Sequence, residues 1–455
     1  MPEPSHSPDP RDFDGNLRVG RKRVRALPGA WHTAGPMCTW SRAIGRALAA
    51  ALAVAAVGCA TVRRYAYFPP LTAEGADIQA ALTIASGNEA VDGNRVELLE
   101  NGDRVFPLML AAIRSARSSI HFEPYIFTDS GIGREFVGSL AERARAGVAV
   151  RLLLDSWGTP GFGEVNERLL REAGARVVHF RPTSLRNLRK IHLRTHRKIL
   201  VVDGKVGFTG GICIDDEWVG DGTDSGHWRD TMVRVEGPVV RQMQAAFARA
   251  WLEATREVLT EQALFPELPA ANGKRCQLME STPGFDGSPA RISFLVAVNA
   301  ARQSIDITNA YFAPDRVALN ALERAARRGV RVRLLLPGRF TDAPPTRHAG
   351  RSDYGTLLRA GIEVYEYQPA KLHAKTMVVD EKWASVGSTN LTPRSLFFNL
   401  EANLNVFDAS FAAEMRAMFE RDLARARRIT YEEWHARPFG DRLAEFFWGL
   451  FRAQY

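Results

Sequence analysis

His196-Arg-Lys198-Ile-Leu-Val-Val-Asp203 and His373-Ala-Lys375-Thr-Met-Val-Val-Asp380 are two copies of one pattern, His-x-Lys-x-x-x-x-Asp. In each copy, the apolar residues after the lysine are typical of a buried strand. Side chains two positions apart point to the same face of a strand. The pattern therefore predicts that an imidazole and an ammonium group project together near the start of each of two strands.

The sequence around the pattern is repeated as well, whereas a lone histidine near a lysine is usually structural or a solvated surface pair. Arg145 to Leu154 match Arg327 to Leu336, and Leu169 to Gly174 match Leu357 to Gly361. Both halves follow the order helix, strand, helix, strand, helix and turn, strand, histidine strand. This period is far longer than that of a solenoid. The repeat predicts a duplicated α/β domain in which helices cover a largely buried sheet.

Composition restricts the class of protein and of partner. The chain has 455 residues and a formal charge of +9, from 60 basic and 51 acidic residues. The length suits about two to three globular domains, and the charge favours anionic partners, either phospholipid surfaces or nucleic acid. The four cysteines are scattered without metal-ligand spacing, so we expect neither a disulfide framework nor a metal site. Cys213 and Cys276 are interpreted as core thiols.

The N-terminal part has the features of an export signal. Residues 1–36 are rich in proline and arginine and predict disorder. Met37 begins a basic stretch that leads into an uncharged run, residues 47–62, which is shorter than the about 20 residues of a membrane span. Ala56-Val57-Gly58-Cys59 resembles a bacterial lipoprotein cleavage box with lipid attached to Cys59, although leucine is usual at its first position. An uncleaved anchor and a soluble tail are the alternatives. The expected location is the bacterial cell envelope, on the periplasmic face of a membrane.

The same reading divides the chain and singles out three further segments. The predicted divisions are 1–59 (disordered N-terminus and signal segment), 60–92 (linker), 93–265 (first domain), 273–430 (second domain) and 431–455 (aromatic and basic tail). The basic run 181–198 is either a solvated loop or a funnel for a phosphate-bearing substrate. The polar stretch 342–353 is expected to form a loop near the site. The tail is either a packed terminal helix or an interfacial membrane helix, and we favour the membrane.

Two histidine and lysine pairs that converge on one point are suited to phosphoryl transfer. One imidazole can attack phosphorus and form a phosphohistidine, and the other can protonate the departing alcohol and then deprotonate the incoming one. Ammonium groups and Asn or Ser donors stabilise charge on the phosphoryl oxygens. This chemistry requires no metal or cofactor, and the chain has no compact carboxylate cluster to bind one. Asp230 and Glu401 occupy matching positions and are the candidates to fix the imidazole tautomers.

The chain resembles the phospholipase D superfamily, whose signature is this duplicated pattern, from about residue 90 to the C-terminus. Within that superfamily it is similar to the bacterial cardiolipin synthases. The stretches that carry this resemblance are Glu123-Pro-Tyr125-Ile-Phe, Gly210-Gly211, Asp216-Glu217-Trp218, Trp228-Arg229-Asp230-Thr, Tyr311-Phe312-Ala-Pro314-Asp315, Arg394-Ser395, Asn399-Leu-Glu401 and Tyr431 to Trp448.

The resemblance implies two tandem α/β/α sandwich domains related by a pseudo-twofold axis. It also implies transfer of a phosphatidyl group from one phosphatidylglycerol to another, with release of glycerol. By matching position, the implied roles are nucleophile (His196), general acid and base (His373), phosphoryl binding (Lys198, Lys375, Ser388, Asn390, with Gly211 beside the substrate), imidazole orientation (Asp230, Glu401) and support of strand ends (Asp203, Asp380). The two halves are nearly symmetric, so the sequence leaves open which histidine attacks.

One departure from the family pattern and two other activities complete this interpretation. Cys213 stands where the family usually has asparagine, so one side of the expected phosphoryl pocket lacks a donor. The same residues would serve a phospholipase D that hydrolyses phospholipids to phosphatidic acid, if water rather than an alcohol accepts the phosphatidyl group. They would also serve a nuclease, but the aromatic tail and the export signal make nucleic acid the less favoured partner.

Overall fold

The strands that follow the two histidines are buried on both faces. The computed structural model describes residues 76–182, 192–268, 273–283 and 288–455. In β5 (Ile199–Val202), Leu200 and Val202 pack into one hydrophobic cluster, and Ile199 and Val201 pack into another on the opposite face. Strand β14 (Lys375–Val379) is divided in the same way. Burial on both faces explains why these strands read as continuous apolar runs rather than as alternating ones.

The two halves share one order of main elements; they differ in the places of two short strands, 228–229 and 371–372, and in one additional helix in the described part of the second half. The first half contains β1 (Val91–Glu100), α3 (Asn101–Ser115), β2 (Ser119–Glu123), α4 (Gly131–Arg145), β3 (Ala149–Asp155), α5 (Glu164–Glu172), β4 (Arg176–Phe180), β5, β6 (Val206–Gly210), β7 (Trp228–Arg229), β8 (Thr231–Glu236) and α6 (Val240–Thr255). The second half contains β9 (Lys274–Ser281), α7 (Pro289–Ala300), β10 (Ser304–Asn309), α8 (Arg316–Arg327), β11 (Arg331–Pro337), α9 (Pro344–Arg351), α10 (Tyr354–Arg359), β12 (Glu363–Tyr367), β13 (Lys371–Leu372), β14, β15 (Trp383–Gly387), β16 (Glu401–Phe407) and α11 (Ala409–Leu423). Short helical turns lie at Asp216–Trp218, Gln262–Leu264 and Arg394–Phe398.

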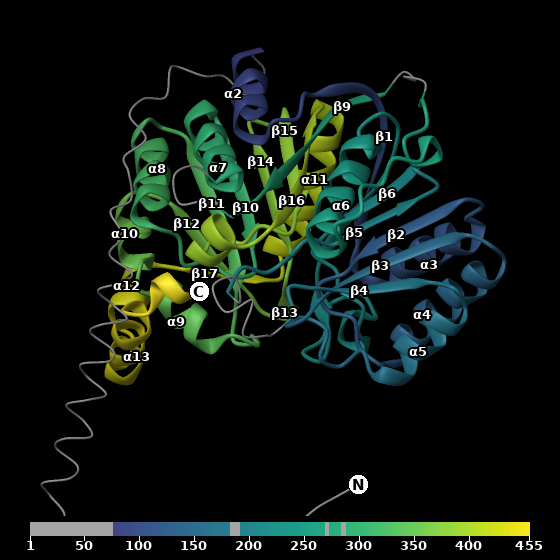
Figure 1. Cartoon of the computed structure of the whole chain (residues 1–455). Helices are drawn as coiled ribbons and strands as arrows, with labels where there is room; N and C mark the ends of the chain where they lie inside the picture. The colour runs from purple at the N-terminus through teal and green to yellow at the C-terminus, as the bar shows by residue number, and fades with distance from the viewer. Residues whose placement is uncertain (1–75, 183–191, 269–272, 284–287) are drawn as a thin grey trace, which may run out of the picture. The chain divides into compact units, whose positions relative to one another are not determined.

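The sheets of the two halves join edge to edge through β1 and β9. The strand order is β17-β12-β11-β10-β14-β15-β16-β9 followed by β1-β8-β6-β5-β2-β3-β4, where β17 is Ala426–Ile429. Apart from β17, each strand on one side of the junction has its counterpart at the same distance on the other side, as a pseudo-twofold relation requires. The predicted α/β class with two related halves is confirmed. The sequence repeat did not indicate that one hydrogen-bonded sheet runs through both (Figure 1).

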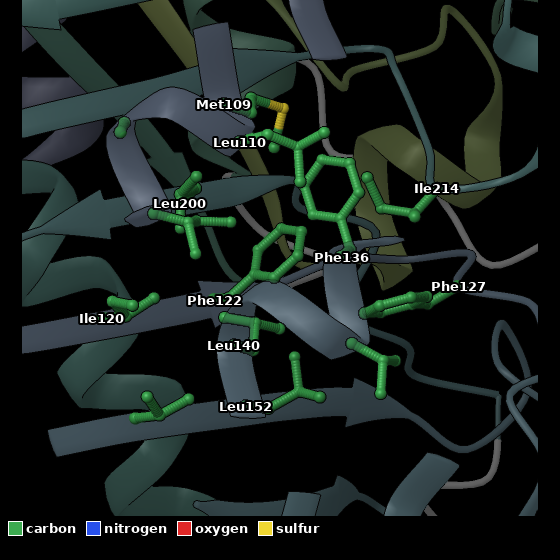
Figure 2. Close-up of a cluster of buried hydrophobic side chains, with 14 of the residues drawn as sticks. Met109, Leu110, Ile120, Phe122, Phe127, Phe136, Leu140, Leu152, Leu200 and Ile214 are labelled. Carbon is green, nitrogen blue, oxygen red and sulfur yellow. The ribbon is translucent and has the colours of Figure 1, made fainter. Parts of the chain in front are cut away.

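Helices α3 and α4 pack against one face of the first-half sheet, and aromatic side chains form part of the core between them. Figure 2 shows Phe122 from β2 together with Phe127 and Phe136. The ring centroid of Phe122 lies 6.0 Å from that of Phe127 and 6.1 Å from that of Phe136. On the other face, side chains of α6 and α11 share one cluster with strands from both halves. The junction of the halves is therefore packed with apolar side chains, which keeps the two histidine strands in a fixed relation.

Two segments at the margins of the halves differ from the expected division. Residues 76–86 fall in the expected linker, but they form helix α2 (Ala76–Ser86), and its Ile78 and Leu82 are buried in the second-half core. Burial of these apolar side chains explains why the segment is helical. The tail forms α12 (Tyr431–His435) and α13 (Phe439–Gly449), and one side of α13 packs on α9. There, the buried Glu445 pairs with Arg351 and Arg437.

In the described ranges, no helix combines the length and the apolarity that crossing a membrane requires. The predicted signal segment, Cys59 and the middle of the basic run (183–191) lie outside the described residues.

Candidate active site

Each histidine is held by backbone from the opposite half of the chain. The amide of His196 donates to the carbonyl of Leu400 at 2.9 Å, and the amide of Leu400 donates to the carbonyl of Arg194 at 2.8 Å. The amide of His373 donates to the carbonyl of Arg229 at 2.8 Å, next to the pairing of β13 with β7. The residues that follow Leu400 and Arg229 are Glu401 and Asp230. These backbone contacts between the halves therefore bring an acidic residue of one half next to the histidine of the other.

The imidazole and carboxylate pairs are crossed between the halves. Nδ1 of His196 lies 3.0 Å from Oε2 of Glu401, and Nδ1 of His373 lies 2.7 Å from Oδ2 of Asp230. Both carboxylates are fully buried. A carboxylate at Nδ1 fixes the proton on that nitrogen and leaves Nε2 with a free lone pair. Each imidazole is therefore oriented for nucleophilic or base chemistry at Nε2.

The residues at 211 and 388 lie behind the carboxylates. The hydroxyl of Ser388 donates to Glu401, and Ser388 is fully buried. At the equivalent position in the first half, a Cβ on Gly211 would lie 2.1 Å from Oδ1 of Asp230, so only glycine fits beside that carboxylate. We expected both residues to contact substrate. The structure places both against these carboxylates, and neither lines the cavity described below.

The two lysines lie directly beneath the histidines. Nζ of Lys198 donates to the carbonyl of His196 at 2.7 Å, and Nζ of Lys375 donates to the carbonyl of His373. Each ammonium also faces a tyrosine ring, Tyr125 at 4.7 Å and Tyr311 at 5.7 Å. Both lysine side chains are only 2% exposed. The two amino groups are therefore held next to the histidines in a medium where charge is poorly screened.

The last residue of each signature stabilises the far end of its strand. Asp203 accepts hydrogen bonds from the backbone amides of Ser118 and Ser119 at 2.7 and 2.9 Å. Asp380 accepts equivalent bonds from Gln303 and Ser304 at 2.7 and 2.9 Å. These amides precede β2 and β10, the neighbours of the histidine strands. The two aspartates are thus remote from the imidazoles and connect adjacent strands.

His196 and His373 line one cavity of about 560 Å³. Aromatic rings surround both imidazoles: Tyr125 lies 4.7 Å from His196, and Trp218, Trp228 and Tyr311 lie 5.3, 5.2 and 5.9 Å from His373 (all centroid distances). The other polar lining residues are Asp215, Glu217, Asp342, Thr346, Asn390, Thr392, Arg394, Ser395, Asn399, Gln454 and Tyr455. Asp342 comes from the polar stretch expected near the site.

Positions 213 and 390 are not equivalent in the folded chain. Asn390 lines the cavity, and its Oδ1 is buried with no hydrogen-bond partner among the residues that the structure describes. Cys213 is 1% exposed and lies outside the lining, where its thiol contacts the carbonyl of Gly211 at 3.8 Å. The first half thus contributes a core thiol where the second half contributes an amide to the cavity.

Most described residues of the basic run point into the protein rather than toward substrate. Arg181 pairs with Glu253, and Arg197 is fully buried, with its guanidinium 2.7 Å from Glu280. Arg194 is also buried and lies 3.6 Å from Asp155. The described part of this run is therefore structural and does not form the expected funnel. Buried ion pairs leave no periodic pattern, so this role could not be predicted from the sequence.

Burial controls the protonation of the site. It lowers the pKa of His196 to about 4 and that of His373 to about 3, against the opposing effect of their carboxylates. Both imidazoles are therefore neutral in the free protein at neutral pH. Burial also lowers the pKa of Lys375 to about 7. A bound phosphodiester brings negative charge, which favours the protonated forms of these groups.

The pH profile should have a basic limb that Lys375 sets. Its ammonium is charged below a pKa of about 7 and neutral above it, so kcat/KM should fall about tenfold per pH unit above that point. An arginine remains charged throughout this range, so Lys375→Arg should move the limb to higher pH. The matched control is Lys205→Arg, at an exposed lysine in the turn after β5. An identical limb in both variants would assign the titration to another group.

Comparison with known proteins identifies the family to which the chain belongs. The family model described as the phospholipase D-like domain of cardiolipin synthase matches residues 109–251 and 294–423. The chain belongs to the cardiolipin synthase family. It is 34% identical over 360 residues to the probable cardiolipin synthase YwiE of Bacillus subtilis (79% of this chain, 72% of that protein). It is 38% identical over 344 residues to cardiolipin synthase A of Pseudomonas fluorescens Pf-5 (75% and 71%).

A solved structure shares the fold of this cardiolipin synthase family member. The crystal structure of phosphatidylserine synthase from Haemophilus influenzae aligns with a TM-score of 0.65 over 83% of this chain and all of that one. The sequence identity is 14%, so this likeness concerns the fold alone.

Proposed function

We propose that the protein is a phosphatidyltransferase that makes cardiolipin from two molecules of phosphatidylglycerol and releases glycerol. Its family assignment supports cardiolipin synthesis. The observation that carries the mechanism is the pair of crossed imidazole and carboxylate contacts, His196 with Glu401 and His373 with Asp230, on one cavity. No metal or cofactor takes part in the proposed steps.

The reaction proceeds in two displacements at phosphorus. In the first, His373, protonated at Nε2 once the anionic substrate is bound, gives that proton to the glycerol oxygen as Nε2 of His196 attacks phosphorus and the bond from phosphorus to that oxygen breaks. In the second, His373 takes the proton from a hydroxyl of the incoming phosphatidylglycerol, whose oxygen attacks phosphorus. The bond from phosphorus to His196 then breaks and the free imidazole is restored. Lys198, Lys375 and Asn390 stabilise the negative charge on the phosphoryl oxygens.

Transfer and hydrolysis differ only in the acceptor, so the products decide between them. We expect vesicles of phosphatidylglycerol incubated with the full chain to yield cardiolipin and glycerol in equal amounts. Phosphatidic acid as the main product would assign the chain to hydrolysis. Double substitution of His196 and His373 by asparagine is the inactive control. Cleavage of DNA by the wild type, absent in that control, would revive the nuclease interpretation.

A membrane surface is the proposed partner of the tail. Five apolar side chains of α13 and its C-terminal end are exposed: Phe439 (78%), Leu443 (56%), Phe446 (66%), Phe447 (48%) and Leu450 (58%). Arg442 lies on the same helix, and α13 packs on α9, whose Thr346 lines the cavity. An apolar face with basic residues at its edge is the composition of an interfacial helix. The tail would hold the cavity at the lipid surface from which substrate comes.

Substituting the exposed rings of the tail should weaken membrane binding more than chemistry. In Phe446→Ser, binding to phosphatidylglycerol vesicles should fall about tenfold, because a large apolar side chain no longer leaves water. Activity on substrate in detergent micelles should change little. Val165→Ser, at an exposed apolar residue on α5, is the matched control. Co-sedimentation with vesicles is the measurement, and equal binding by both variants would refute the role of the tail.

The cell envelope is the proposed location, with lipid attached to Cys59 after cleavage of the signal segment. The motif Ala56-Val57-Gly58-Cys59 supports this proposal. Mass spectrometry of the mature N-terminus tests it, since a chain that retains residues 37–58 would exclude lipoprotein processing.

A further inference from the structure

The cavity has opposite polarity beside its two histidines. Around His373 it is lined by the carboxylates of Asp215, Glu217 and Asp342 and by two stacked tryptophans, Trp218 and Trp228, 5.1 Å apart. On the side of His196, where Tyr125 contacts the imidazole, the lining includes the cation Arg394 and the polar side chains of Ser395 and Asn399. The two histidine sites are thus nearly symmetric in their imidazole and carboxylate pairs, but the cavity lining beside them is asymmetric.

Among the three carboxylates, Asp342 has the fewest partners in the described part of the chain. Glu217 pairs with Lys371 at 2.8 Å and accepts from the indole of Trp228 at 2.9 Å. Asp215 accepts from Thr128 and from the amide of Glu217. Asp342 accepts from the phenol of Tyr311, at 2.8 and 3.0 Å, and in the described ranges no lysine or arginine forms an ion pair with it. Its carboxylate has about four acceptor positions, and Tyr311 is the one side chain that donates to them in the described ranges.

The direction of displacement relates this carboxylate to the headgroup. An attack by His196 places the leaving alcohol opposite that imidazole, on the side of His373. Tyr311 connects Asp342 to that side, because its ring contacts His373 and its hydroxyl holds the carboxylate. A glycerol headgroup there has hydroxyl hydrogens for Asp342 to accept. A headgroup that carries its own carboxylate would bring like charge next to Asp342.

We propose that Asp342, positioned by Tyr311, selects the headgroup by accepting a hydrogen bond from it. The inference deepens the proposed function, on which it rests. Accepted headgroups are hydrogen-bond donors without negative charge, which means a polyol such as glycerol or an ammonium such as ethanolamine. Anionic headgroups are rejected. The departing glycerol and the incoming phosphatidylglycerol use this site in turn, because His373 serves both.

Competition between soluble acceptors measures this selection. The full chain is given phosphatidylglycerol in micelles with deuterium-labelled glycerol, ethanolamine or glycerate, and each phosphatidyl product is quantified by mass spectrometry, which separates labelled phosphatidylglycerol from the unlabelled donor. We expect the wild type to use glycerol and ethanolamine and to reject glycerate. In Asp342→Asn, the KM for phosphatidylglycerol should rise about tenfold, the loss expected for a hydrogen bond to a charged group. Use of glycerate relative to glycerol should rise about fivefold, the effect of like charges about 4 Å apart at an exposed residue. The relative use of glycerol and ethanolamine tells whether the site favours a polyol or an ammonium.

Two further measurements separate selection from folding and from the proposed function. A phosphatidyl ester of p-nitrophenol has no polyol headgroup, so Asp342→Asn should cleave it like the wild type. Glu172→Gln, an exposed carboxylate on α5, should change neither measurement. Unchanged acceptor preference in Asp342→Asn, or loss of p-nitrophenyl ester cleavage, would overturn the proposal. If the wild type only hydrolyses lipid, the proposed function fails, and the same preference can still be read from which phospholipid headgroups leave.

Discussion

His373→Asn should release one equivalent of p-nitrophenol from a phosphatidyl p-nitrophenyl ester and then stall, whereas His196→Asn should release none. The phenolate leaves without a proton donor, so formation of the phosphohistidine needs the nucleophile but not the general acid. The next step needs His373 to deprotonate the acceptor. Steady-state transfer from phosphatidylglycerol should fall by at least about 10⁴-fold in His196→Asn and by about 10²–10⁴-fold in His373→Asn.

Stopped-flow absorbance gives the burst amplitude, and peptide mapping of the stalled enzyme locates the phosphoryl label. Label on His196 in the His373→Asn variant supports the assignment. The opposite pattern, a burst in His196→Asn with label on His373, would reverse the two roles and leave the rest of the mechanism unchanged. Residue 192 provides a control, because His192→Asn alters a histidine that is not among the cavity-lining residues.

Local pattern was enough to predict the fold class, because the residues that define it are close in sequence. The run from Ile199 to Val202 is apolar at every position since both faces are buried, and its second copy shows that the domain is duplicated. Strands β1 and β9 were not anticipated. β1 contains Gly93, Asn94 and several charged residues, so it has neither alternation nor an apolar run, and its place in the sheet depends on partners far away in the chain.

The site was predictable as a set of residues but not as an arrangement. Matching positions singled out Asp230 and Glu401, yet the crossing of the pairs depends on contacts such as β7 with β13, which join residues 228–229 to 371–372. Such pairings leave no trace in a single sequence. The role of Gly211 was also hidden, because its significance lies in the 2.1 Å that a Cβ would leave to Asp230. Asp342 was expected near the site only as part of a polar stretch.

The crossed pairs imply that removing a carboxylate should impair the histidine of the other half. In Asp230→Asn, the amide can donate to Nδ1 of His373 and place the ring proton on Nε2, where it blocks acceptance of a proton from the acceptor. Loss of a carboxylate that fixes a catalytic tautomer costs about 10⁴-fold in turnover. Asp230→Asn should therefore show the burst and stall of His373→Asn. Glu401→Gln should lose the burst, like His196→Asn.

Gly211→Ala tests the contact of Asp230 with His373 by moving the carboxylate of Asp230. An added Cβ 2.1 Å from Oδ1 of Asp230 must move that carboxylate away from His373, so this variant should also give a burst followed by a stall. Gly138→Ala is its control, since a Cβ at that position on α4 meets no atom within 4 Å. Thermal unfolding of each variant separates lost positioning from lost stability. If Asp230→Asn instead behaved like His196→Asn, and Glu401→Gln like His373→Asn, each carboxylate would act on the histidine of its own half, which would contradict the crossed geometry on which the mechanism rests.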